Sequence, residues 1–134
     1  MLKKFLPAAI WSFIILILTG IPGSDLPRIH NFWGWIEPDK VVHLFIFGVL
    51  MFLILLGFRE KYFFSKKRYW FGIVSVVITS VYGMITEILQ IYVFVGRSGS
   101  RFDFYTDAIG AIFGWIVFYL VFRKKIRNAS SSER

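Results

Sequence analysis

The sequence predicts an all-α integral membrane protein, a compact four-transmembrane-helix bundle with both termini in the cytoplasm. Of the 134 residues, 57% are hydrophobic and 20% are aromatic, which is more apolar than an ordinary soluble domain of this size. Four long runs, almost free of charged residues, each come close to the roughly 20 residues that cross about 30 Å of hydrocarbon. These runs cover residues 5–21, 41–58, 70–95 and 104–122.

Each run is interpreted as a helix for its own reason. Lys3 and Lys4 precede the first run as in a secretory signal, but no Ala-x-Ala-like cleavage site follows, so we expect a retained helix. The second run follows Pro38, a residue suited to a helix start. The third and fourth runs are separated only by a short polar stretch. We expect residues 1–125 to form one transmembrane domain and residues 126–134 to be a disordered cytoplasmic tail.

The charged residues are divided unequally between the two sides of this bundle. Twelve of the 16 basic residues lie on the side of the termini, namely Lys3, Lys4, Arg59, Lys61, Lys66, Lys67, Arg68, Arg123, Lys124, Lys125, Arg127 and Arg134. The positive-inside rule makes this side cytoplasmic. The net charge of +8 then indicates anchoring to anionic membrane lipids, and we expect no nucleic-acid partner.

Asp39 and His43 stand four residues apart at the start of the second run, so they share a helix face. One interpretation is a helix-capping Asp39 beside an interfacial histidine. The other is a carboxylate–imidazole pair, in which Asp39 or another acid fixes the tautomer of His43 so that it can move protons.

The third run contains a carboxyl group within apolar sequence. Gly83, Glu87 and Gln90 follow one another at helical spacing and lie along one stripe. If the hydrocarbon ends near Val95, Glu87 is about 12 Å deep at 1.5 Å per residue. A carboxylate at that depth costs several kcal/mol unless it is paired, protonated or in a wet cavity. Glu87 is therefore either part of a functional site or a structural residue whose polar contact joins two helices.

Polar residues continue from this run into the next. Arg97 and Arg101 carry planar guanidinium groups that suit phosphate or carboxylate. In the fourth run, four residues spaced by four, three and four positions share one stripe: Asp103, Asp107, Gly110 and Gly114. The two glycines favour close approach to a neighbouring helix, which would carry Asp107 toward Glu87 and His43, and their face also allows a homodimer without requiring one.

Several kinds of chemistry have no support in the sequence. The chain has no cysteine, which excludes disulfides and thiolate sites. A metal site built from the histidine and the acids is conceivable, but no H-E-x-x-H spacing occurs, so we expect neither a metal nor a cofactor. Ser98 and Ser100 lie in no nucleophile-elbow pattern.

The order of these polar residues resembles that of VanZ-like membrane proteins. "PDKVVHLFIFG" resembles their Asp-Lys-x-x-His motif, and "TEILQIYVFVGRSGSRFDFYTDAIGAIFG" resembles a second signature of Glu-x-x-Gln, Arg, Asp, a common Asn, and Gly. The matching positions are Asp39, Lys40, His43, Glu87, Gln90, Arg97, Asp103, Asp107 and Gly110. One position departs from the pattern, because Asp107 replaces the neutral amide with a group that can carry charge.

The resemblance implies a bacterial protein with several transmembrane helices, placed in the cytoplasmic membrane. The family is named for a protein associated with resistance to the glycopeptide teicoplanin. The resemblance therefore connects the chain with glycopeptide resistance or envelope homeostasis.

Three functions stay open at this point. The first, which we favour, is binding of an anionic amphiphile from the outer leaflet. Arg97 and Arg101 would hold the anion, Gln90 and Glu87 would hydrogen-bond its polar part, and aromatic walls would take its chain. The other expected ligand-binding residues are Asp39, Lys40, Asp103 and Asp107. The second is a membrane enzyme, a hydrolase or transferase on a phospholipid-like or polyprenyl-phosphate substrate, with His43 and Glu87 as acid and base. The third is a non-catalytic assembly factor whose polar residues only join helices.

Overall fold

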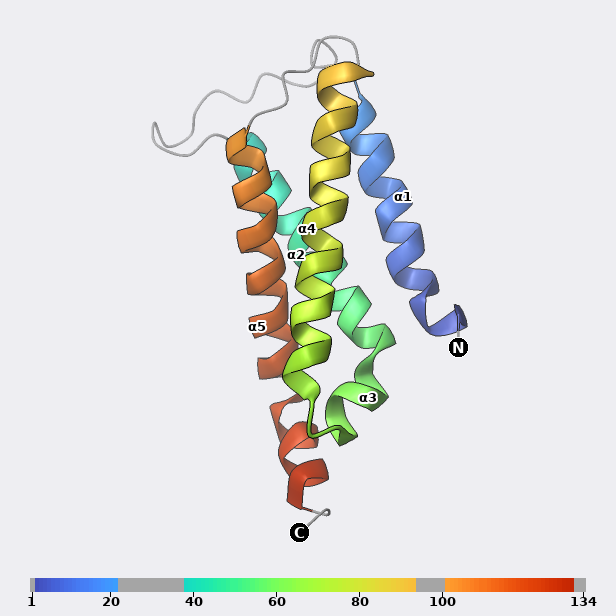
Figure 1. Cartoon of the computed structure of the whole chain (residues 1–134), viewed down its shortest axis with the longest axis vertical. Helices are drawn as coiled ribbons and strands as arrows, with labels where there is room; N and C mark the ends of the chain where they lie inside the picture. The colour runs from blue at the N-terminus through green and yellow to red at the C-terminus, as the bar shows by residue number, and fades with distance from the viewer. Residues whose placement is uncertain (1, 22–37, 94–100, 132–134) are drawn as a thin grey trace.

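The computed structural model describes residues 2–21, 38–93 and 101–131, and these residues are almost entirely helical (Figure 1). The elements are the 3-10 helix η1 (Leu2–Phe5) and the α-helices α1 (Leu6–Gly20), α2 (Pro38–Gly57), α3 (Arg59–Phe64), α4 (Arg68–Tyr92) and α5 (Arg101–Ser131). Within these described residues, four helices are long and apolar enough to cross a membrane. The predicted all-α membrane fold is therefore confirmed.

Two elements differ from the prediction. α5 continues to Ser131, so most of the expected tail from residue 126 is helical in the structure. The reason is that Ile126 and Ala129 are buried in the same apolar cluster as Tyr62 and Phe63 of α3. α3 itself lies in the connection between the second and third predicted runs, where no helix was predicted. It closes the end of the bundle at which α1 begins and α5 ends (Figure 1).

α2 is central to the packing and contacts both apolar clusters of the core. One cluster joins α2 to α1 and includes Ile15 and Phe47, which are both fully buried. The other joins α2, α3 and α5 and includes Leu55 and Phe118. The outward-facing side chains of the long helices are mostly large and apolar, as expected where lipid replaces water as the surrounding medium. Packing against α2 therefore fixes where each of the other spans stands.

The contact between α2 and α5 depends on glycine. A Cβ atom on Gly110 would lie 2.5 Å from the carbonyl oxygen of Leu44, and one on Gly48 would lie 3.2 Å from the carbonyl oxygen of Gly110. Gly114 likewise faces the backbone of Gly48. The predicted close approach of the fourth span to a neighbour is thus made to α2 of the same chain, as in small-residue helix contacts generally.

An ion pair joins the two shortest helices at the end where the chain begins. Nζ of Lys4 in η1 lies 2.6 Å from Oε2 of Glu60 in α3. The hydrogen bond from Lys4, together with its charge, lowers the pKa of Glu60 below its ordinary value. Both side chains are exposed, so this pair positions η1 more than it stabilises the fold.

The opposite end of the bundle gathers the ends of four helices. α1 and α4 finish there, and α2 and α5 begin there (Figure 1). Polar residues near the start of α2, the start of α5 and the end of α4 are therefore brought to one level of the bundle.

Candidate functional site

Three helices carry ionisable side chains at the same depth in the bundle. His43 is five residues from the start of α2, Glu87 five residues from the end of α4, and Asp107 six residues from the start of α5. At 1.5 Å per residue, each lies about 8 to 9 Å from its helix end. Asp103 stands one turn nearer that end on α5. All four are buried, and we call them the acid–histidine cluster.

One short contact in this cluster joins α2 to α5. Nδ1 of His43 lies 2.9 Å from Oδ1 of Asp107, and Asp107 is fully buried. The His43 ring also stacks on Phe47, with 6.1 Å between ring centroids. When Asp107 is ionised it can only accept a hydrogen bond, and in that state Nδ1 carries the hydrogen and Nε2 is the basic nitrogen. The sequence suggested an acid partner for His43, and the structure supplies it from α5.

Glu87 and Asp103 complete the cluster from α4 and α5. One carboxylate oxygen of each and one ring nitrogen of His43 all lie within 4.8 Å of one another. Because Asp107 occupies Nδ1, Nε2 is the nitrogen suited to a metal, an arrangement in which the carboxylate orients the imidazole. One nitrogen and two carboxylate oxygens suit zinc or manganese better than calcium. The described donors therefore fit a divalent cation, although the sequence spacing predicted none.

Gly83 makes room for this cluster on α4. A Cβ atom at Gly83 would lie 2.6 Å from Oδ2 of Asp107 and 3.1 Å from its Cβ atom. Thr86 lies about one turn further along α4, and its hydroxyl donates a hydrogen bond of 2.8 Å to the carbonyl oxygen of Gly83. Glycine at position 83 thus lets Asp107 lie against the α4 backbone.

Other polar residues of α4 contact α1 instead. Nε2 of Gln90 donates to the carbonyl oxygen of Thr19 over 3.4 Å, a long hydrogen bond. The hydroxyl of Tyr82 donates to the carbonyl oxygen of Ser12 over 2.5 Å. These contacts are of the kind that holds transmembrane helices together. Gln90, predicted as a ligand-binding residue, therefore has a structural hydrogen bond to α1.

The remaining predicted site residues lie at the edge of the described structure. Lys40 is partly buried in the first turn of α2. Asp39 and Arg101 belong to α2 and α5, but their side chains lie outside the described residues, as does the whole of Arg97. The structure thus brings together His43, Glu87, Asp103 and Asp107.

Sequence reasoning missed part of the surroundings of the cluster. Thr19 of α1 is a buried polar residue whose carbonyl oxygen accepts the hydrogen bond from Gln90, but an isolated threonine in an apolar helix carries no spacing signal. An apolar groove of about 230 Å³ between α2 and α5 was also missed. It starts at Leu44 and Phe45, the two residues that follow His43 in the sequence, and continues to Phe113 and Val117.

The fold and the cluster define a polytopic membrane protein with a buried acid–histidine cluster near one end of a four-span bundle. The chain belongs to the VanZ/LLP1 family, whose family model matches residues 5–123. No curated protein and no solved structure matches it. The predicted family resemblance is thereby confirmed, and the family match covers every residue of the cluster.

Proposed function

We propose that this protein binds the anionic headgroup of a membrane amphiphile at the acid–histidine cluster, with the amphiphile's chain in the groove between α2 and α5. The observation that carries the proposal is the burial of His43, Glu87, Asp103 and Asp107 at one level of three apolar helices. Ionisable groups at that position are costly, and they are found in membranes mostly where they serve a site.

A purely structural role, in which the polar residues only join helices, accounts less well for this arrangement. A pair such as His43 and Asp107 is enough to join α2 to α5. Two more carboxyl groups, of Glu87 and Asp103, lie near the same imidazole, which is more ionisable groups than the joining of two helices requires. Neutral groups join helices elsewhere in this bundle, through the hydrogen bonds of Gln90 and Tyr82 to α1.

Recognition of an anion at this end needs positive charge beside the acids. His43 supplies one charge when it is protonated, and Lys40 lies one turn before it on α2. The sequence adds Arg97, between α4 and α5, and Arg101, the first residue of α5, and arginine forks suit phosphate oxygens. A divalent cation on the cluster would act in the same sense, by bridging carboxylates to phosphate.

The groove between α2 and α5 supports an amphiphile over a soluble anion. It is lined by apolar side chains and glycines, and it begins at Leu44, the residue after His43. A headgroup at the cluster would therefore have its hydrocarbon chain beside Gly48, Phe52 and Val117, where burial of apolar surface stabilises binding.

The test is binding of a polyprenyl monophosphate, compared with the uncharged polyprenol, to the purified protein in nonionic detergent. We expect the phosphate to bind tighter than the alcohol. His43→Ala and Arg97→Ala should each weaken it about tenfold or more, the scale of a lost charged hydrogen bond. Glu60→Gln, an exposed acid at the other end, is the matched control. Unchanged binding in both folded variants would leave only the assembly-factor function.

A second candidate function is acid–base catalysis on the same class of substrate. The His43–Asp107 contact favours it, since a carboxylate on Nδ1 prepares Nε2 to take or give a proton. Glu87→Gln separates the two functions. Both should keep their affinity for the polyprenyl phosphate, but only an enzyme with Glu87 as its base has a turnover in the wild type that this variant would lose.

The cellular process belongs to the same proposal. Deletion of the gene, tested against teicoplanin and other cell-wall drugs, should change susceptibility if the protein acts in glycopeptide resistance or envelope homeostasis. Complementation with His43→Ala should then fail, while Glu60→Gln should restore the wild-type phenotype.

A further inference from the structure

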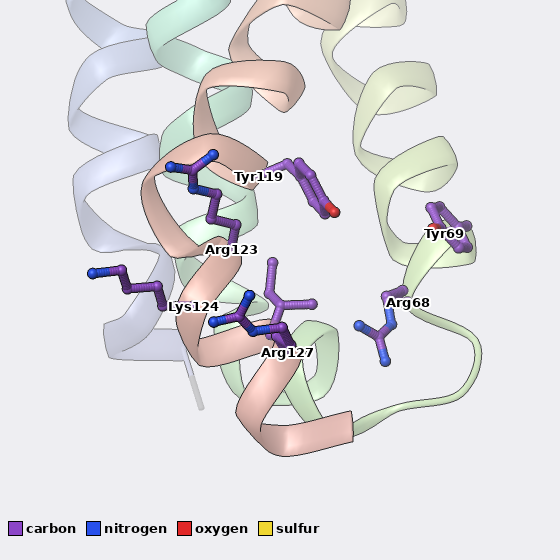
Figure 2. Close-up of a pocket in the computed structure, with 7 residues that line it drawn as sticks. Arg68, Tyr69, Tyr119, Arg123, Lys124 and Arg127 are labelled. Carbon is purple, nitrogen blue, oxygen red and sulfur yellow. The ribbon is translucent and has the colours of Figure 1, made fainter. Parts of the chain in front are cut away.

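A second hollow lies at the opposite end of the bundle from the acid–histidine cluster. This basic cavity has a volume of about 530 Å³ and lies between the start of α4 and the last turns of α5 (Figure 2). Its lining residues are Arg68, Tyr69, Tyr119, Arg123, Lys124, Ile126 and Arg127. Figure 2 shows Tyr119 extending from α5 toward α4, where Arg68 and Tyr69 stand.

The charge of the basic cavity is of one sign. Four of its seven lining residues are cationic, and none of these described lining residues is acidic. The last turns of α5, which carry three of these cations, are held in place because Ile126 is buried in the apolar cluster shared by α2, α3 and α5. Like charges held together in a hollow create a strong positive potential, which favours a ligand with several anionic oxygens.

A second, less polar hollow of about 290 Å³ adjoins the basic cavity and shares Tyr69 and Tyr119 with it. Its other lining residues are Tyr62, Trp115 and Ile116. Trp115 lies one turn before Tyr119 on α5, on the side of the membrane centre. The two hollows therefore form a continuous surface, with charge at the bundle end and aromatic rings toward the hydrocarbon, which is the polarity of a lipid molecule.

We propose that this surface is a binding site for an anionic phospholipid, whose phosphate lies in the basic cavity against Arg68, Arg123 and Arg127. Its acyl chain lies along Tyr69, Tyr119 and Trp115. The site is separate from the acid–histidine cluster and does not depend on the function proposed there. The distribution of basic residues assigns this end to the cytoplasm, so the lipid comes from the inner leaflet.

The chain offers a matched control for nonspecific attraction. Lys61 and Lys66 lie at the same end and are exposed, but they do not line the basic cavity. Removing two charges from either pair lowers the general potential equally, so a binding site is shown by the difference between the two double variants.

The experiment measures retention of phosphatidylglycerol by the purified protein with native mass spectrometry, against phosphatidylcholine with the same acyl chains. We expect Arg123→Gln/Arg127→Gln to lower phosphatidylglycerol retention about tenfold, and Lys61→Gln/Lys66→Gln less than twofold, because only the first pair contacts the phosphate. Equal losses in the two double variants, or equal retention of phosphatidylcholine, would overturn the proposal. Competition by glycerol 3-phosphate as strong as by phosphatidylglycerol would show a free phosphate site and overturn the lipid assignment.

A measurement on the unaltered chain covers the case in which the arginine variant does not fold. Phosphatidylglycerol with a photoreactive group in its acyl chain should crosslink to the peptides containing Tyr69, Trp115 or Tyr119. Crosslinks confined to the groove between α2 and α5 would contradict the proposal.

Discussion

Nδ1 of His43 on α2 and Oδ1 of Asp107 on α5 lie 2.9 Å apart, with both side chains buried. Gly83 places the backbone of α4 against the other oxygen of the same carboxyl group. Asp107 of α5 therefore contacts both α2 and α4, so its replacement should affect the packing of all three helices.

Asp107→Asn should preserve the stability of the fold, whereas Asp107→Leu should lower it. The asparagine carbonyl still accepts from Nδ1 of His43, but leucine leaves that buried donor without an acceptor, a loss of about 1 to 3 kcal/mol. Thermal unfolding in detergent should therefore show a lower Tm for the leucine variant. Equal Tm values for the two variants would show that the hydrogen bond to His43 contributes little.

Gly83→Ala should displace the carboxyl group of Asp107. The added methyl group would stand 2.6 Å from Oδ2, and overpacking of this kind typically costs about 1 to 3 kcal/mol. We expect a lower Tm and weaker binding of polyprenyl phosphate. Met84→Ala, at the next position and 47% exposed, is the control, and it should bind as the wild type does. A Gly83→Ala protein with wild-type binding would mean that Asp107 can shift without consequence.

The contact between Tyr62 and Trp115 predicts a loss of stability at alkaline pH. Nε1 of Trp115 donates to the Tyr62 hydroxyl over 2.8 Å, and burial raises the pKa of Tyr62 above its ordinary value of 10.0. In the unfolded chain Tyr62 loses its proton first. Its contribution to stability is therefore complete below pH 10 and is lost as the pH rises toward the folded pKa.

Tyr62→Phe is the comparison for that pH dependence. It removes the phenol and leaves the indole donor without its acceptor, so the Tm near neutral pH should fall by the equivalent of about 1 to 2 kcal/mol. The decline of Tm above pH 10 should become shallower than in the wild type. An identical alkaline decline in both proteins would assign it to the other tyrosines.

The three donors of the acid–histidine cluster predict stabilisation by a divalent transition metal. Zn²⁺ or Mn²⁺ at a hundredfold excess over its Kd should stabilise the wild type by about 2.7 kcal/mol. His43→Gln and Glu87→Gln should remove this shift, and Glu60→Gln should retain it. A Tm that neither the metals nor a chelator changes would show that the cluster binds no cation.

The sequence predicted the spans to within a few residues, except at the end of α5. The continuation of that helix was not predicted, because four basic residues surround the buried Ile126 in the sequence, namely Arg123, Lys124, Lys125 and Arg127. α3 was not predicted for the same reason, since its six residues begin with the charged sequence Arg-Glu-Lys. In both cases the helix depends on burial against another element, and a local hydrophobic run does not report such contacts.

The residues that form the acid–histidine cluster could be predicted from the sequence, but which of them contact one another could be predicted only in part. Helical spacing placed Glu87 and Asp107 on inward faces, because each shares a stripe with a glycine. Which acid would reach His43 depended on how closely α2 and α5 approach, and that distance is set by backbone contact at Gly48 and Gly110. Likewise, the hydrogen bond from Gln90 to Thr19 depends on the position of α1, which no local pattern reports.

The unbroken course of α5 links the two ends of the molecule mechanically. Asp107 and Arg123 stand sixteen residues apart on this one helix, about 24 Å at 1.5 Å per residue. Between them, Gly110 and Gly114 press against the backbone of α2. A tilt of α5 about its contact at these glycines would therefore move Asp107 and Arg123 in opposite directions.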